Sequence, residues 1–173
     1  MAAKILLIGT LLGGLVTGVP PAFGDTTGAA GHAMANRVVV LKGERRLILL
    51  RDATVLRSYR VALGRNPQGP KLADGDGRTP EGRYVLDWRN PRSRFHRSIH
   101  ISYPGPEDLA RARGRGLSPG GDIMIHGLPS RLGGFAAEHV QWDWTEGCIA
   151  VSNAEMDEIW DLVADGTVIE IRP

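Results

Sequence analysis

The single cysteine of the chain, Cys148, is the residue best suited to covalent chemistry. It ends the run Thr145-Glu-Gly-Cys148, and the 173 residues contain no second cysteine. A thiolate nucleophile needs a base within hydrogen-bond reach and N–H donors for the oxyanion of a tetrahedral intermediate. His126 ends the apolar run at residues 122–126, which is typical of a buried strand, and is the candidate base. Gly147 predicts a close approach between backbone and substrate. The alternative for Cys148 is a buried, inert thiol.

Few other residues have the spacing of a reactive site. His96 and His100 lie four residues apart, but no third ligand accompanies them, so no metal site is expected. A single cysteine also excludes a multi-cysteine zinc or iron–sulfur centre and an internal disulfide framework. His139 is expected at the surface of a loop. Trp142 and Trp144 are predicted either to fill the core or to form an aromatic wall for a ligand.

Short β-strands predominate among the elements that must position these residues. The β-rich runs, separated by turn residues, cover 38–41, 47–50, 55–61, 82–88, 98–103, 122–126 and 167–171. A firm helix is predicted at 153–164, where Ser152 and Glu155 form a capping box and four apolar residues share one face. Residues 106–113 have a weaker helical pattern. The sequence therefore predicts a mainly β (β-rich α+β) domain with one clear helix in its C-terminal half.

The first 24 residues have the layout of a secretory signal peptide. Lys4 precedes an uncharged apolar stretch at 5–19, which two prolines break, and small residues follow up to Gly24. The stretch is shorter than the about 20 apolar residues of a membrane span. We therefore expect export, to the periplasm or the cell wall, with no integral membrane span once the signal is processed; the alternative is that the segment is retained as an anchor. Residues 25–36 are expected to be a flexible linker, which leaves 37–173 as one domain.

Composition and charge are those of an ordinary globular domain. Hydrophobic residues make up 42% and charged residues 23%, which argues against a disordered chain or a coiled coil. The formal net charge is +2, but residues 78–115 hold nine arginines against four acids. No nucleic-acid partner is expected, because this segment lacks interleaved aromatics and the chain is expected to be exported. The expected counterpart is a cell-wall polymer, an anionic surface or the acidic residues at 138–170.

Four separated motifs together resemble the L,D-transpeptidase catalytic domain, the YkuD family. That family has a His-Gly at a strand end followed by Ser/Thr-His-Gly-Cys, and here His126-Gly127 precedes Thr145-Glu-Gly-Cys148. Upstream, residues 61–64 and 78–84 are similar to the paired strand and loop segments of the family. The resemblance covers residues 37–172 and implies a YkuD-like mixed β-sheet or sandwich domain.

The resemblance implies a cysteine acyltransferase of peptidoglycan biosynthesis that affects the cell wall and cell shape. Cys148 attacks the carbonyl of the third residue of a stem peptide and D-alanine leaves. His126, oriented by the backbone carbonyl of Gly127, moves the thiol proton. The acyl group then passes to an amine, as a cross-link or as the attachment of a wall protein. No metal or organic cofactor is implied. The implied substrate contacts are Thr145, Glu146, Gly147, His100, Tyr103 and Trp144.

Two departures from the family pattern leave the acyl acceptor open. Glu146 stands where the family commonly has histidine, and Ala150 where it commonly has arginine or asparagine. A carboxylate beside Cys148 disfavours the thiolate. The Gly-Cys-x-Ala form is also similar to a branch of the family that includes hydrolases. The leading prediction is an exported L,D-transpeptidase. The alternatives are an L,D-carboxypeptidase or amidase with the same Cys–His dyad, and a non-catalytic wall-binding module.

Overall fold

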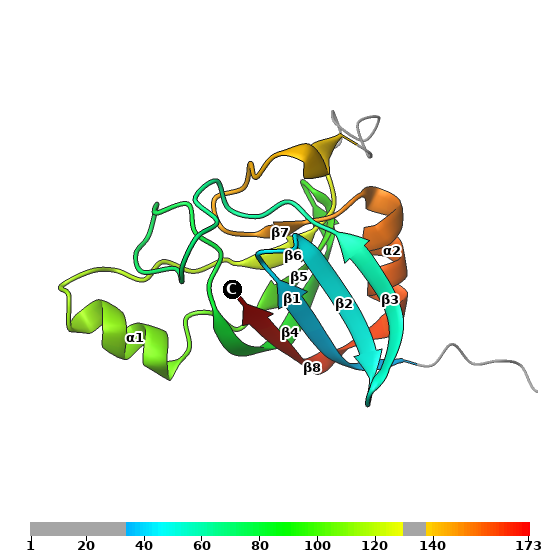
Figure 1. Ribbon diagram of the computed structural model, residues 1–173, viewed down its shortest axis with the longest axis horizontal. Helices are drawn as coiled ribbons and strands as arrows, with labels where there is room; N and C mark the ends of the chain where they lie inside the picture. The colour runs from blue at the N-terminus through cyan, green and yellow to red at the C-terminus, as the bar shows by residue number, and fades with distance from the viewer. Residues whose placement is uncertain (1–33, 130–137) are drawn as a thin grey trace, which may run out of the picture. The chain divides into compact units, whose positions relative to one another are not determined.

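Within the described residues, one eight-stranded sheet forms the body of the domain. The computed structural model describes residues 34–129 and 138–173. The sheet order is β3-β2-β1-β8-β4-β5-β6-β7. In chain order the elements are β1 (Ala35–Leu41), β2 (Arg46–Arg51), β3 (Thr54–Arg60), β4 (Gly82–Ser93), β5 (His96–Ile101), α1 (Pro106–Arg113), β6 (Met124–His126), the 3-10 helix η2 (His139–Gln141), β7 (Ile149–Ala150), α2 (Asn153–Leu162) and β8 (Val163–Arg172) (Figure 1). The mainly β fold class predicted from the sequence is confirmed.

Alternation along the strands separates the core from solvent. In β1, Val38 and Val40 are fully buried, and in β2 the same is true of Leu47 and Leu49. β1 pairs antiparallel with β2 and parallel with β8, whose Ile169 lies opposite Val38. Residues at every second position therefore meet in one apolar cluster, as period-2 patterning requires.

The two ends of the sheet are joined by the chain that follows β3. Ala62 and Ala150 exchange both backbone hydrogen bonds, at 3.0 and 2.9 Å, and Gly64 forms a further bridge with Thr145. Since β3 and β7 are the first and last strands of the sheet order, these contacts curl the sheet upon itself. The closure sets the residues just before β7, including Cys148, against residues 62–64.

Helix α2 begins as the sequence predicts and ends earlier. Ser152 and Glu155 form the capping box, in which each side chain accepts the other's backbone N–H. The helix packs against β5, β6 and β8 (Figure 1). It ends at Leu162 instead of residue 164 because Arg89 of β4 satisfies carbonyls at its C-terminus: Nη1 donates to Trp160 O at 2.7 Å, and Nη2 donates to Val163 O. β8 then begins at once.

Several other boundaries differ from the sequence pattern. β1 begins at Ala35, two residues inside the predicted linker, because Ala35 pairs with Val163 of β8. β4 runs on to Ser93 through a pairing irregularity and forms a hairpin with β5. The weaker helical pattern at 106–113, by contrast, is confirmed: Pro106–Arg113 is an α-helix, capped by the carboxylate of Asp108. β7 has no counterpart among the predicted strands.

The predicted signal peptide and most of the predicted linker lie outside the described residues. Within residues 34–129 and 138–173, no helix has both the length and the apolar character needed to cross a membrane.

Candidate active site

His126 and Cys148 lie on one face of the sheet, His126 at the end of β6 and Cys148 just before the start of the neighbouring strand β7. β6 and β7 are parallel, with Ile125 opposite Ile149 and His126 opposite Ala150. Because side chains alternate along a strand, Cys148, two residues before Ala150, points to the same face as His126. Both residues line one cavity of about 430 Å³. Strand register thus brings the candidate nucleophile and the candidate base together.

A backbone carbonyl fixes the tautomer of His126. Nδ1 lies 2.6 Å from the carbonyl oxygen of Gly127. A carbonyl can only accept a hydrogen bond, so Nδ1 carries the proton and Nε2 keeps its lone pair. The ring centroid lies 4.5 Å from that of Phe95 and 5.8 Å, edge-on, from that of Trp144. Burial lowers the pKa of His126 to about 4, so the imidazole is neutral at pH 7 and can accept a proton.

The Cys148 thiol keeps its proton in the resting state. Burial raises the pKa of Cys148, and the carboxylate of Asp122 raises it further, while a hydrogen bond from the Met124 backbone opposes both. Sγ lies 3.6 Å from the carbonyl oxygen of Asp122, which can only accept from S–H. The pair is therefore a neutral thiol and a neutral imidazole rather than a preformed thiolate–imidazolium pair.

The turn before Cys148 is held by contacts within the protein. Thr145 is buried, and its Oγ1 donates to the Cys148 carbonyl at 2.8 Å and accepts the Gly147 N–H at 3.1 Å. Gly147 has φ +133°, and a Cβ there would lie 2.6 Å from the carbonyl oxygen of Arg78. Glycine is required here by the neighbouring backbone rather than by a substrate. The Gly147 N–H is already engaged and is not free to bind an oxyanion.

Glu146 does not lie beside the thiol. Its side chain is 65% exposed and forms an ion pair with Arg65. The carboxylate that raises the pKa of Cys148 belongs instead to Asp122. The sequence proximity of Glu146 to Cys148 is misleading because the turn directs its side chain outward.

Comparison with known proteins decides the family. The model of the L,D-transpeptidase catalytic domain, YkuD, matches residues 35–171. The chain belongs to this family. The Escherichia coli (strain K12) protein named "Putative L,D-transpeptidase YafK" is 31% identical over 138 residues, which cover 76% of this chain and 48% of that protein. The chain thus spans about half the length of the curated relatives it matches.

Solved structures share the fold of this L,D-transpeptidase domain. The helical cell shape determining protein Pgp2 from Campylobacter jejuni superimposes with a TM-score of 0.58 at 22% identity, over 84% of this chain and 52% of that one. The L,D-transpeptidase from Xylanimonas cellulosilytica DSM 15894 gives a TM-score of 0.52 at 17% identity, over 81% and 61% of the two chains. The YkuD-like fold implied by the sequence motifs is therefore confirmed.

Two further residues that the resemblance implied as substrate contacts in the L,D-transpeptidase domain do not line the cavity. Tyr103 is 3% exposed, packs in the core and donates its hydroxyl to the Pro119 carbonyl at 3.0 Å. His100 stacks on Trp88, with ring centroids 4.9 Å apart, and its Nδ1 lies 2.6 Å from Asp87 Oδ1. Trp144 packs on His126 and is the aromatic residue of this set that reaches the dyad.

His96 and His139 do not line the cavity that contains Cys148. His96 Nε2 lies 2.7 Å from Asp157 Oδ1. The prediction that His139 lies at the surface is wrong, because this residue is in η2 and is 5% exposed. Its ring also contributes to the lowered pKa of His126. In the described part of the chain, no group of three or more His, Cys, Asp and Glu side chains could hold a metal ion.

The cavity also contains residues that sequence reasoning missed. Besides Cys148, His126, Asp122 and Met124, its lining includes Asn90, Ser93, Arg94, Phe95 and Ser98. They come from the β4–β5 hairpin, far from both motifs in sequence. The excess of arginine over residues 78–115 was the available signal, but it did not distinguish Arg94 from its neighbours.

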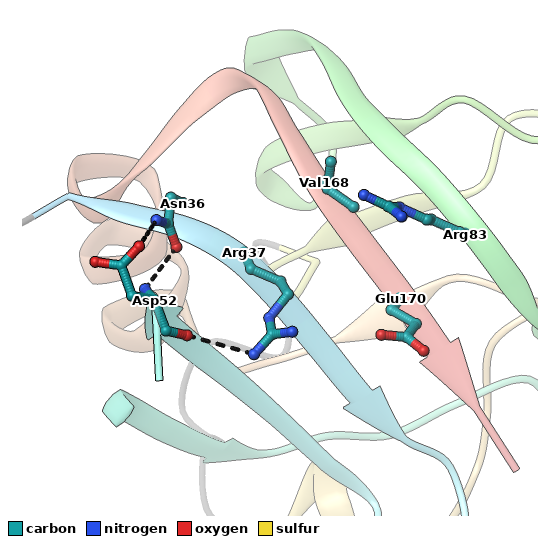
Figure 2. A pocket seen from close by; sticks show the side chains of 6 residues that line it. All are labelled: Asn36, Arg37, Asp52, Arg83, Val168 and Glu170. Atoms are coloured by element: carbon teal, nitrogen blue, oxygen red, sulfur yellow. Dashed lines mark hydrogen bonds between the residues drawn. The ribbon is translucent and has the colours of Figure 1, made fainter. Parts of the chain in front are cut away.

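A second cavity, of about 360 Å³, lies over β1, β4 and β8 (Figure 2). Its lining residues are Asn36, Arg37, Asp52, Arg83, Val168 and Glu170. Figure 2 shows the side chains of Asn36 and Arg37 hydrogen-bonded to Asp52. This cavity contains neither Cys148 nor His126, so the candidate reaction site is the cavity at the dyad.

Proposed function

We propose that this domain is an exported cysteine L,D-transpeptidase that transfers an acyl group from a peptidoglycan stem tetrapeptide to an amine. The observation that carries the proposal is that the neutral His126, with Nδ1 bonded to the Gly127 carbonyl and Nε2 left as the proton acceptor, lines the same cavity as Cys148. Membership of the L,D-transpeptidase catalytic domain family supports the reaction class. The signal-like residues 1–24 support export to the periplasm or cell wall.

The first half-reaction forms a thioester. Sγ of Cys148 attacks the carbonyl carbon of the third stem residue while the thiol proton passes to Nε2 of His126. The C–N bond to D-alanine then breaks, and the imidazolium returns the proton to the leaving amine. Burial of both groups disfavours a free thiolate–imidazolium pair, so proton transfer accompanies attack instead of preceding it.

The second half-reaction regenerates the thiol. An acceptor amine attacks the thioester carbonyl, gives its proton to Nε2 of His126, and displaces the Cys148 sulfur, which recovers the proton. The acceptor is an amine of a second stem peptide or of a wall-attached protein. If water takes the place of the amine, the same dyad acts as a hydrolase.

Mass spectrometry of the purified protein with disaccharide-tetrapeptide tests this reaction. We expect a covalent adduct on Cys148 equal in mass to the donor minus D-alanine, followed by a cross-linked dimer when donor and acceptor are both present. Cys148→Ala should form no adduct, and His126→Gln should form it at least tenfold more slowly. An adduct that decays only to tripeptide would establish the hydrolase. Binding of peptidoglycan without any adduct, unchanged in Cys148→Ala, would establish a wall-binding module.

A further inference from the structure

A row of polar side chains continues from His126 across the sheet. Strand pairing places Ser98 of β5 opposite His126, and Asn90 of β4 opposite Ser98. Residues that pair across neighbouring strands point to the same face of a sheet. All three residues line the cavity that holds Cys148. The wall of the cavity is therefore polar from β4 to β6.

The hydroxyl of Ser98 is unsatisfied in this row. Ser98 is 1% exposed, and within the described residues its Oγ has no hydrogen-bond partner. Buried hydroxyl groups in native proteins are almost always hydrogen-bonded, because desolvation without a partner is costly. A ligand in the cavity can supply the missing acceptor.

Arg94 brings positive charge to the same cavity. It lies in the β4–β5 hairpin with its guanidinium carbon 5.0 Å from the centroid of the Phe95 ring, and Phe95 in turn packs on His126. No carboxylate of the described residues forms an ion pair with Arg94. Asp122, which precedes β6, is the carboxylate among the lining residues. The cavity thus has a cationic side on the hairpin and an anionic side before β6.

We infer that Asn90, Arg94 and Ser98 form a carboxylate-binding subsite beside the dyad. Arg94 contributes a charge-assisted hydrogen bond, Ser98 donates its free hydroxyl, and the Asn90 amide adds a neutral donor. Asp122 repels a carboxylate from the opposite side of the cavity and so sets its orientation. The assignment of the ligand rests on the proposed function. The carboxylate is then that of the terminal D-alanine or that of the side chain of the third stem residue.

Alkylation of Cys148 by a matched pair of reagents tests the subsite without turnover. N-bromoacetylglycine carries a carboxylate, and N-bromoacetylglycinamide is its neutral amide; both form an S–C bond to Cys148 and release bromide. Because both react with the same thiolate, the ratio of their rates does not depend on the pKa of Cys148. We expect Arg94→Gln to lower the acid-to-amide rate ratio by about tenfold and Ser98→Ala by about threefold, the range of one charge-assisted and one neutral hydrogen bond.

Arg92→Gln is the matched control, because Arg92 lies in the same hairpin region and does not line the cavity. It should leave the rate ratio unchanged. The subsite is overturned if Arg94→Gln leaves the ratio unchanged, or if Arg92→Gln lowers it equally, which would indicate a general surface field. It is also overturned if the amide labels Cys148 and the acid does not, because the cavity would then exclude a carboxylate of this size.

Amidated tetrapeptides identify which carboxylate is bound. Amidation of the recognised carboxylate should lower kcat/KM of the native enzyme by about tenfold and should have little effect in Arg94→Gln. The subsite is overturned if the native enzyme processes both amidated tetrapeptides as fast as the free acid. Failure to process any stem peptide overturns the proposed function alone, because the alkylation ratio measures the subsite independently.

Discussion

Replacing His126 by glutamine is expected to make the stability of the protein less sensitive to acid. The buried ring of His126 donates from Nδ1 to the Gly127 carbonyl, and glutamine is an uncharged side chain with an amide donor. Glutamine cannot take up a proton in this pH range. The substitution therefore removes the titration of His126 and leaves an uncharged polar side chain in its place.

The magnitude follows from the lowered pKa of His126. Burial lowers it from 6.5 to about 4, so the folded protein binds this proton more weakly than the unfolded chain does. Between these two pH values the unfolded chain is the more protonated, and the free energy of unfolding falls as the pH falls. The loss begins near pH 6.5 and is complete near pH 4, where it amounts to about 3 kcal/mol.

Urea unfolding at a series of pH values from 4 to 8, followed by tryptophan fluorescence, measures this effect. The native protein should lose about 3 kcal/mol more than His126→Gln between pH 7.5 and pH 4. His139→Gln is the comparison variant, because burial also lowers the pKa of His139 and its contribution has the same sign. Because His139 contributes to the lowered pKa of His126, the effect of the double variant should be smaller than the sum of the two single effects.

Parallel stability curves for the native protein and His126→Gln would refute the reasoning. That result would mean that His126 titrates alike in the folded and unfolded states, so that the ring is not held neutral by burial. The argument for a neutral thiol–imidazole pair at rest would then fail with it.

Three further perturbations test the contacts around the dyad and the loop behind it. Asp122→Asn removes a carboxylate that raises the pKa of Cys148, so labelling by a neutral alkylating reagent should begin at lower pH; an unchanged pH profile contradicts this. Thr145→Val removes the hydroxyl that joins the Cys148 carbonyl to the Gly147 N–H and should cost about 2–3 kcal/mol in urea unfolding, whereas an unchanged midpoint would show that the turn holds without it. Lys42→Met leaves two carbonyls and the half-buried carboxylate of Glu81 without their shared donor and should cost about 3 kcal/mol; a loss below about 1 kcal/mol would contradict this.

The parts of the fold that could be predicted depend on interactions between residues close together in the sequence. β-rich runs separated by turn residues predicted β1 to β3 approximately, and the Ser152–Glu155 capping box predicted the start of α2. Each of these signals acts over a few residues. The end of α2 could not be predicted in the same way, because Arg89, from a strand distant in sequence, satisfies its last carbonyls.

The sequence by itself determined the two residues of the dyad. Cys148 is the one thiol of the chain, and His126-Gly127 and the Gly147-Cys148 turn carry the family motif. Their meeting in one cavity depends on the parallel register of β6 and β7. Hydrogen bonds between Ala62 and Ala150, which are far apart in the chain, hold β7 from its other side.

Only the tertiary structure decided what surrounds the dyad. It placed Asp122 rather than Glu146 near the thiol, buried His139, and brought Arg94 and Ser98 into the cavity. The spacing of residues in the sequence predicts which side chains share a face of one strand or helix. Which faces meet depends on strand register and core packing, and these are settled by contacts summed over the whole domain.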